Sequence, residues 1–88
     1  MCSYYGAGLA GHKTANGERL NPHALTAAHK KLPFGTHVRV HVGSHSVVVR
    51  INDRGPFVAG RILDVSPAAA DKLGIRSKGV AHCTIQKV

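Results

Sequence analysis

Acidic side chains are scarce in this 88-residue sequence, which has four Asp and Glu against twelve Lys and Arg and a formal net charge of +8. Such a chain attracts polyanions, so nucleic acid, anionic lipid headgroups and anionic cell-wall polymers are all candidate partners. The four acidic residues are Glu18, Asp53, Asp64 and Asp71. Because carboxyl chemistry can use only these positions, they are the first candidates for a site.

Aromatic residues and long apolar runs are also few. The sequence has no Trp, two Tyr and two Phe, and no basic stripe interleaves with them, so we expect no nucleic-acid partner. Hydrophobic residues occur in short runs, which excludes a transmembrane helix. No charged segment followed by an apolar one precedes Cys2, so a signal peptide is either absent or removed.

Only two cysteines are present, Cys2 and Cys83, near opposite ends of the chain. A disulfide closing so long a loop contributes roughly 4 kcal/mol in the chain-entropy treatment. It would also suit an oxidising compartment. The alternative is that both thiols are unpaired and buried as small hydrophobic side chains.

The chain has no internal repeat, low-complexity tract or linker-like stretch, which predicts a single domain over residues 1–88. Val alternates with His and Arg over residues 37–42, and a second alternating segment covers residues 47–51. Gly43-Ser44 between them can form a tight type II′ turn, so the two segments predict a β-hairpin. Further strands are expected at residues 2–5, 61–65 and 80–87.

Two short helices are expected between the strands. Ser66 would cap a helix that starts at Pro67 and ends at Gly74. Asn21 would cap another that runs through Ala28 and places His29 in its last turn. Short strands with brief helices predict a mainly β fold, a small closed barrel, because closure removes exposed strand edges.

Two of the carboxylates occupy unusual positions. Asp53 lies where a strand ends in a turn, and Asp64 lies in an otherwise apolar strand. A largely buried Asp must be hydrogen-bonded, be paired, or carry a raised pKa, which is what a general acid needs. The alternatives are a turn-stabilising role for Asp53 and a structural ion pair from Asp64 to Arg54 or Arg61.

The other two carboxylates have ordinary surroundings. Glu18 lies in a polar loop, where an exposed glutamate is common, and Asp71 has the surroundings of a solvated surface charge. No Gly-x-Ser-x-Gly motif and no phosphate-binding glycine loop is present, and we expect no cofactor.

Seven histidines offer further candidates. His37, His41 and His45 lie on or beside the predicted hairpin without a cysteine or carboxylate at ligand spacing, so we expect no metal site. His29, at the end of its predicted helix, could aim its imidazole across a groove.

Six sequence blocks in the same order closely resemble RlpA-like (rare lipoprotein A) domains, over nearly the whole chain from Ser3 onward. The blocks are Ser3-Tyr4-Tyr5-Gly6, Thr14-Ala15-Asn16-Gly17-Glu18, Leu25-Thr26-Ala27-Ala28-His29, Leu32-Pro33-Phe34-Gly35-Thr36, Val49-Arg50-Ile51-Asn52-Asp53-Arg54-Gly55-Pro56 and Asp64-Val65-Ser66. The resemblance implies a six-stranded double-psi β-barrel with two or three short helices. It also implies lytic transglycosylase activity on peptidoglycan glycan strands, preferably strands that lack stem peptides.

The resemblance also assigns a groove. Its lining would be Tyr5, Thr14, Glu18, His29, Asn52 and Asp53. Asp53 would act as acid and base, with His29 and Glu18 positioning the sugar or tuning the acid. Expansins and certain fungal endoglucanases share the barrel, and their catalytic-type Asp is more similar to Asp64. Asp64 is therefore a second acid candidate or a structural residue.

The resemblance implies a location in the cell envelope, in the periplasm, at the outer membrane or outside the cell, and a lipid anchor could be present in the full-length protein. We expect a monomer. The sequence departs from the family in a shorter hairpin turn, in its terminal cysteines and in lacking a SPOR domain, so we expect no septal targeting by that route. The alternative function is a non-catalytic, expansin-like module that binds cell-wall glycan.

Overall fold

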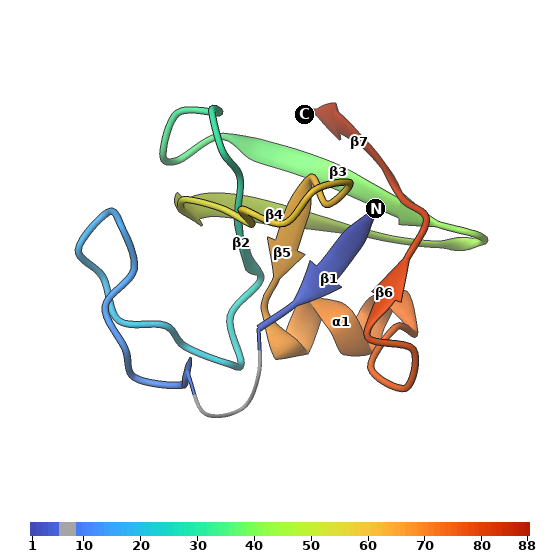
Figure 1. The fold of residues 1–88 in the computed structure, drawn as a ribbon, viewed down its shortest axis with the longest axis horizontal. Helices are drawn as coiled ribbons and strands as arrows, with labels where there is room; N and C mark the ends of the chain where they lie inside the picture. The colour runs from blue at the N-terminus through green and yellow to red at the C-terminus, as the bar shows by residue number, and fades with distance from the viewer. Residues whose placement is uncertain (6–8) are drawn as a thin grey trace.

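The structure is a computed structural model that describes residues 1–5 and 9–88 (Figure 1). It is mainly β, as expected. The strands are β1 (Cys2–Tyr4), β2 (Thr26–Ala28), β3 (His37–Val42), β4 (His45–Asp53), β5 (Leu63–Val65), β6 (Val80–Ala81) and β7 (Thr84–Lys87). The helix among the described residues is α1 (Pro67–Leu73), and none there is long and apolar enough to cross a membrane.

The strands form one sheet in the order β6-β1-β5-β2-β4-β3-β7. The expected closed barrel of six strands with two or three helices is wrong in these details, since the described residues form seven strands, an open sheet and one helix. The predicted strand 80–87 is interrupted at His82 and Cys83, so that β6 pairs with β1 while β7 pairs with β3. These two residues bring the opposite edges of the sheet together through the covalent chain, and not through a hydrogen-bonded ladder.

The predicted hairpin is confirmed. β3 and β4 pair antiparallel from His37 opposite Arg50 to Val42 opposite His45. Gly43 has a φ of 57°, and no residue other than glycine has a positive φ in the described chain, which is the pattern of a type II′ turn. β4 continues beyond the hairpin to Asp53, so the second strand carries the candidate site at its end.

Helix α1 has the predicted ends. Ser66 has an extended backbone and its hydroxyl accepts a hydrogen bond from the Ala69 N–H at 3.3 Å, while Gly74 ends the helix in the left-handed region at φ 70°. The Ser66 hydroxyl also donates to the carbonyl oxygen of Ala24 at 2.6 Å. The cap therefore ties α1 to the segment that leads into β2.

The helix expected after Asn21 is wrong. The Asn21 side chain accepts a hydrogen bond from the His23 N–H at 2.9 Å, but this closes a turn, and the chain then enters β2. β2 pairs with β4 on one side and β5 on the other, with Ala27 and Ala28 fully buried. Two strand ladders and this burial outweigh the weak helix preference of three residues. His29 therefore follows a strand.

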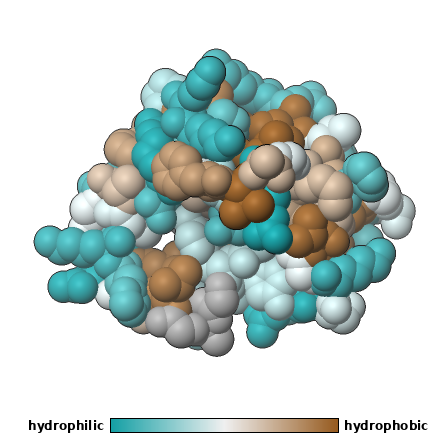
Figure 2. Space-filling model, viewed as in Figure 1, coloured by the Kyte–Doolittle hydropathy of each residue, from teal (hydrophilic) through white to brown (hydrophobic). Residues whose placement is uncertain are grey.

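The core is built from small and branched apolar side chains of all parts of the sheet and from one face of α1, which packs on β4 and β1. Tyr5, Leu20 and Ala28 form a second, smaller buried cluster next to the candidate site. On the face of the molecule seen in Figure 2, apolar side chains lie in separate patches among hydrophilic ones. Phe57, in the loop between β4 and β5, is 79% exposed.

A disulfide joins Cys2 of β1 to Cys83, with their Cα atoms 5.8 Å apart. Cys2 is fully buried, and Cys83 lies in the two-residue connection between β6 and β7. The bond therefore holds the N-terminal strand at the place where the two edges of the sheet meet.

We predict that reduction destabilises the domain by up to about 4 kcal/mol, because it frees a long loop in the unfolded chain. Urea unfolding of the oxidised and reduced protein measures the difference, and the double variant Cys2→Ala/Cys83→Ala should match the reduced protein. Thiol titration of the unfolded, unreduced chain should find no free thiol. Two free thiols would show that the bond does not form.

Candidate active site

Two carboxylates flank a small side chain at the end of β2. Ala28 lies opposite Asp53 of β4 on one side and opposite Asp64 of β5 on the other. Since adjacent strands are about 4.8 Å apart, the two aspartate backbones are roughly 10 Å apart with Ala28 between them. Cross-strand partners point to the same side of a sheet, so the fold places both carboxylates beside one short side chain.

Asp53 is held by three hydrogen-bond donors. Its Oδ1 accepts from the backbone N–H groups of Ala15 and Arg54, both at 2.8 Å, and its Oδ2 accepts from the Tyr5 hydroxyl at 2.9 Å. Burial, together with this hydrogen bond and the Asp53 charge, raises the pKa of Tyr5, so its hydroxyl stays a donor. The carboxylate therefore joins the end of β4 to two distant segments, and its Oδ2 has one partner only.

Asp64 is half-buried and accepts a hydrogen bond from the Ser3 hydroxyl of β1 at 2.6 Å. Burial raises the pKa of Asp64; the Ser3 hydrogen bond and the charge of Arg61 oppose this rise, and the Asp53 charge adds to it. The ion pairs in the described part of the chain are Arg50–Glu18 and Arg76–Asp71, so the alternative in which Asp64 forms an ion pair with Arg54 or Arg61 is wrong, although the Arg61 charge acts on Asp64.

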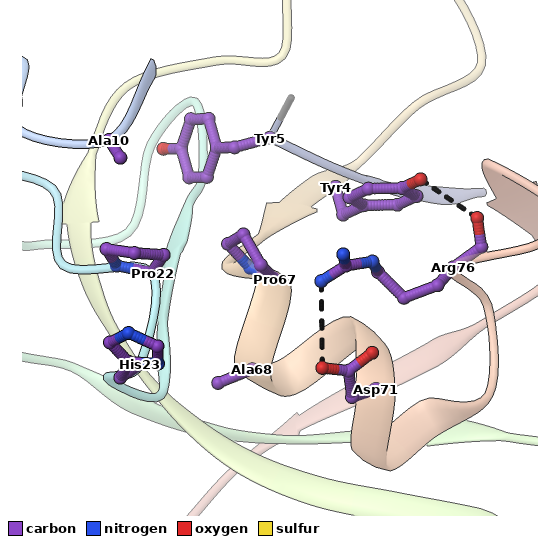
Figure 3. A pocket seen from close by; sticks show the side chains of 9 residues that line it. All are labelled: Tyr4, Tyr5, Ala10, Pro22, His23, Pro67, Ala68, Asp71 and Arg76. Carbon is purple, nitrogen blue, oxygen red and sulfur yellow. Dashed lines mark hydrogen bonds and ion pairs between the residues drawn. The ribbon is translucent and has the colours of Figure 1, made fainter. Parts of the chain in front are cut away.

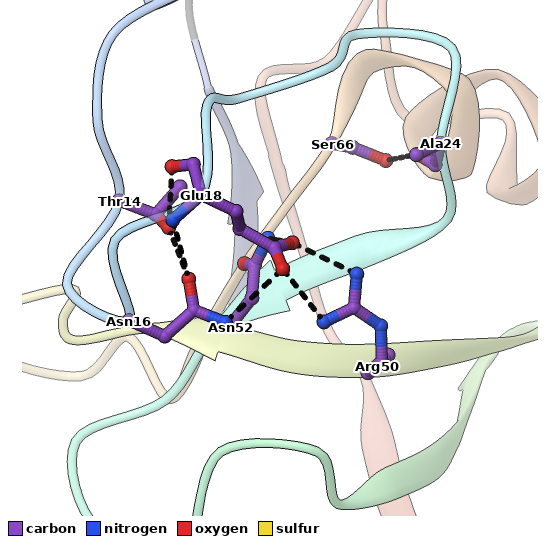
Figure 4. A network of polar contacts seen from close by, with 7 residues as sticks. All are labelled: Thr14, Asn16, Glu18, Ala24, Arg50, Asn52 and Ser66. Carbon is purple, nitrogen blue, oxygen red and sulfur yellow. Dashed lines mark hydrogen bonds and ion pairs between the residues drawn. The ribbon is translucent and has the colours of Figure 1, made fainter.

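Glu18 is the centre of a polar network (Figure 4). Arg50 donates to both of its oxygens, at 2.8 and 3.2 Å, and the Asn52 amide donates to Oε1 at 2.6 Å. These hydrogen bonds lower the pKa of Glu18 to about 2, so its carboxylate is charged at neutral pH and holds no proton to donate.

The loop around Glu18 is tied to the same strand end. The Thr14 hydroxyl lies 2.6 Å from Asn16 Oδ1, and the Asn16 amide donates to Glu18 at 3.2 Å. The Asn16 backbone N–H donates to the Asn52 carbonyl at 3.2 Å. Thr14 and Asn52 are both buried, so they support the network and expose little surface to a ligand.

His29 lies beside this site in a turn. Its Nδ1 accepts hydrogen bonds from the backbone N–H groups of Lys31 and Leu32, both at 3.0 Å. Burial and the nearby Arg54 charge hold the pKa of His29 below its ordinary value, which favours the neutral ring. Arg54 donates to the carbonyl oxygens of His29 and Leu32 and stacks on Phe34 at 4.0 Å, which fixes the turn.

The fold brings the candidate residues to one region. Asp53, Tyr5 and Asp64 surround Ala28, and the network of Glu18, Thr14 and Asn52 adjoins it because Asn52 precedes Asp53. His29 joins them through its backbone N–H, which donates to the Asp53 carbonyl at 3.2 Å. In residues 1–5 and 9–88 no three His, Cys, Asp or Glu side chains gather to hold a metal ion.

Arg50 and Asn16 were not among the candidates from the sequence, although both contact Glu18. A signal for Arg50 does exist: it lies two residues before Asn52 in a strand, so both side chains point to the same face. Nothing in the sequence indicates that the face is opposite Glu18, because that contact spans 32 residues.

Comparison with known proteins adds to this geometry. The chain is 54% identical to a probable endolytic peptidoglycan transglycosylase RlpA of Synechocystis over 100% of this chain and 28% of that protein. The corresponding protein of Nostoc is 56% identical over 98% of this chain and 24% of its own length. The endolytic peptidoglycan transglycosylase RlpA of Neisseria meningitidis serogroup A is 51% identical over 98% of this chain and 37% of its own length.

The chain thus spans about a quarter to just over a third of the length of these relatives. A family profile described as lytic transglycolase, of the double-psi β-barrel type, matches residues 1–85. This match covers every strand that positions the two aspartates. From this match and these identities, the chain belongs to the lytic transglycolase family of double-psi β-barrel domains.

Proposed function

We propose that this domain is a lytic transglycosylase that cleaves the glycan strands of peptidoglycan. The observation that carries the proposal is the placement of Asp53 and Asp64 on either side of Ala28, in a chain that matches this family almost from end to end. Ala28 is itself buried with Tyr5 and Leu20, so the sugar would contact the two half-buried carboxylates and not Ala28.

Lytic cleavage needs an acid and a base but no water. The acid protonates the oxygen that bridges two sugars, and the base takes the proton of the muramyl C6 hydroxyl. That hydroxyl oxygen attacks its own anomeric carbon as the bridging bond breaks, which gives a 1,6-anhydromuramyl end and a new hydroxyl on the departing sugar. One carboxylate can serve in both steps, because the proton that it gives to the bridging oxygen is replaced by the proton that it takes from the C6 hydroxyl.

We assign this proton transfer to Asp53 and propose Asp64 as the secondary acid. Asp53 has an oxygen, Oδ2, whose one protein partner is the Tyr5 hydroxyl, so it retains capacity for a substrate hydroxyl. Burial of Asp64 raises its pKa, which makes a proton more available there than on an exposed aspartate. Glu18 and His29 hold the strand end and the adjoining turn in place.

The wider setting is also part of the proposal. The substrate would place the domain in the cell envelope, in the periplasm, at the outer membrane or outside the cell. We further propose that it acts as a monomer, on its own or tethered through a lipid anchor in a longer protein, and that it prefers strands without stem peptides.

A second candidate function is a non-catalytic module that binds cell-wall glycan. One observation favours it: both backbone donors to Asp53, from Ala15 and Arg54, give its carboxylate a structural role that needs no chemistry.

The substitution Asp53→Asn separates the two functions. Asparagine keeps the size of the side chain but cannot transfer the proton, so cleavage of denuded glycan strands should fall at least about 100-fold while sacculus binding persists. The rate is measured by mass analysis of released fragments, in which anhydromuramyl ends are one water lighter than hydrolytic ends.

Asp64→Asn is the control for Asp53→Asn, because it makes the same change at the other aspartate. Thermal unfolding of both variants shows whether either substitution lowers stability. Near wild-type release of anhydro products by Asp53→Asn would show that Asp64 is the acid. Wild-type protein that releases nothing from denuded strands would establish the binding module in place of the enzyme.

The low pKa of Glu18 predicts an acid-sensitive network. A carboxylate whose pKa falls from its ordinary 4.5 to about 2 on folding contributes stability above pH 4.5, which is lost as the pH falls toward 2. Urea midpoints measured from pH 5 to pH 2 should therefore fall less steeply for Glu18→Gln than for wild type. Asp71→Asn, which removes an exposed carboxylate of α1, should keep the wild-type slope, and equal slopes for all three proteins would contradict the network.

The net charge of +8 predicts salt-dependent attraction to an anionic wall. Pull-down on purified sacculi should weaken between about 0.02 and 0.15 M salt, where the screening length falls to about 8 Å. The exposed pair Lys30→Gln/Lys31→Gln should give weaker and less salt-sensitive binding. Binding that does not change with salt would mean that short-range contacts supply the affinity.

A further inference from the structure

A separate pocket of about 410 Å³ shares the wall made by Tyr5 with the candidate active site (Figure 3). It opens between the turn at Pro22 and His23 on one side and the first turn of α1 on the other. Neither Asp53 nor Asp64 lines it. Pockets that bind small organic groups have volumes of about 300–1,000 Å³, so the size suits a single sugar.

The walls of this pocket are mainly rings and short apolar side chains. Pro22, Pro67 and Ala68 form its apolar surface, and the rings of Tyr4 and Tyr5 stand above them in Figure 3. The faces of aromatic and proline rings pack well on the C–H faces of sugars and on acetyl methyl groups. A polar ligand with one apolar face would fit these walls.

Arg76 adds a cation held in a fixed position. Its guanidinium lies 5.6 Å from the centre of the Tyr4 ring, and the Tyr4 hydroxyl donates to the Arg76 carbonyl at 2.8 Å. Its Nη1 forms the ion pair with Asp71 Oδ2 at 3.6 Å, and the exposed Asp71 also lines the pocket. In the described chain the guanidinium donates no hydrogen bond, so the N–H groups that do not face Asp71 can bind an anion, and their planar fork matches a carboxylate.

We propose that this pocket is a second glycan subsite that binds a muramyl residue through the free carboxylate of its lactyl group. The proposal rests on the proposed function. Arg76 pairs with the carboxylate, and the acetyl methyl group packs on Pro22, Pro67 and Ala68. A stem peptide converts this carboxylate into an amide and removes the charge. The subsite therefore discriminates between strands with and without peptide at a point away from the reacting atoms.

The test is a nuclear magnetic resonance titration with N-acetylmuramic acid, and with N-acetylglucosamine, which lacks the lactyl carboxylate. The acid should shift the backbone signals of His23 and Ala68, and Arg76→Gln should weaken its binding about tenfold, the value of one charge-assisted pair. Arg76→Lys should recover part of the affinity. N-acetylglucosamine should bind equally to all of these proteins.

Lys87→Gln is the control for charge, because it removes one positive charge from the exposed end of β7. Equal weakening by Lys87→Gln and Arg76→Gln would overturn the subsite, as would signal shifts confined to Ala28 and Asp53. Ala68→Leu fills the pocket and should abolish binding of both sugars; retained binding would also overturn it.

The ligand is a monosaccharide with no glycosidic bond, so its binding does not depend on catalysis. Failure of the wild type to cleave strands would overturn the proposed activity alone, whereas failure of N-acetylmuramic acid to bind would overturn the subsite alone.

Discussion

The pairing of β2 on both of its sides is the interaction on which the site depends. β2 has only three residues, all buried, yet it is the strand that separates β4 from β5. A shift in register between Ala27 and Ala28 leaves Asn52 without a cross-strand partner and places Asp53 opposite Ala28. Asn52 is then free to hold Glu18, and Asp53 lies across Ala28 from Asp64. A small error in this register would separate the two aspartates.

The carboxylates near this strand differ in what surrounds them. Glu18 accepts from Arg50 and Asn52, and these donors lower its pKa, which makes it a fixed anion that organises the loop. Asp64 has one hydroxyl donor, and its burial raises its pKa, so the charged form is less favoured there than on an exposed aspartate. The proposed proton transfer would use such a difference, because carboxyl groups with identical surroundings would have the same pKa.

The support for these groups comes from far along the chain. Ser3, which donates to Asp64, belongs to β1, and β1 is held by the disulfide from Cys2 to Cys83 and by pairing with β5 and β6. Tyr5, which donates to Asp53, follows the same strand and also forms a wall of the pocket beside Arg76. The N-terminal strand is thus the common support of both aspartates and of the proposed second subsite.

The sequence by itself determined the features that depend on neighbours in the chain. Valine alternation and Gly43 predicted the hairpin, and Ser66 with Gly74 predicted both ends of α1. Turns and helix caps are formed by hydrogen bonds between residues that are close in the sequence. The tertiary structure alone decided that residues 26–28 form a strand, since pairing with two distant strands outweighed a local helix signal. It likewise decided that His29 lies in a turn, that the sheet stays open, and that Arg50 meets Glu18 across 32 residues. These outcomes depend on contacts between distant segments, which patterns along the chain do not record.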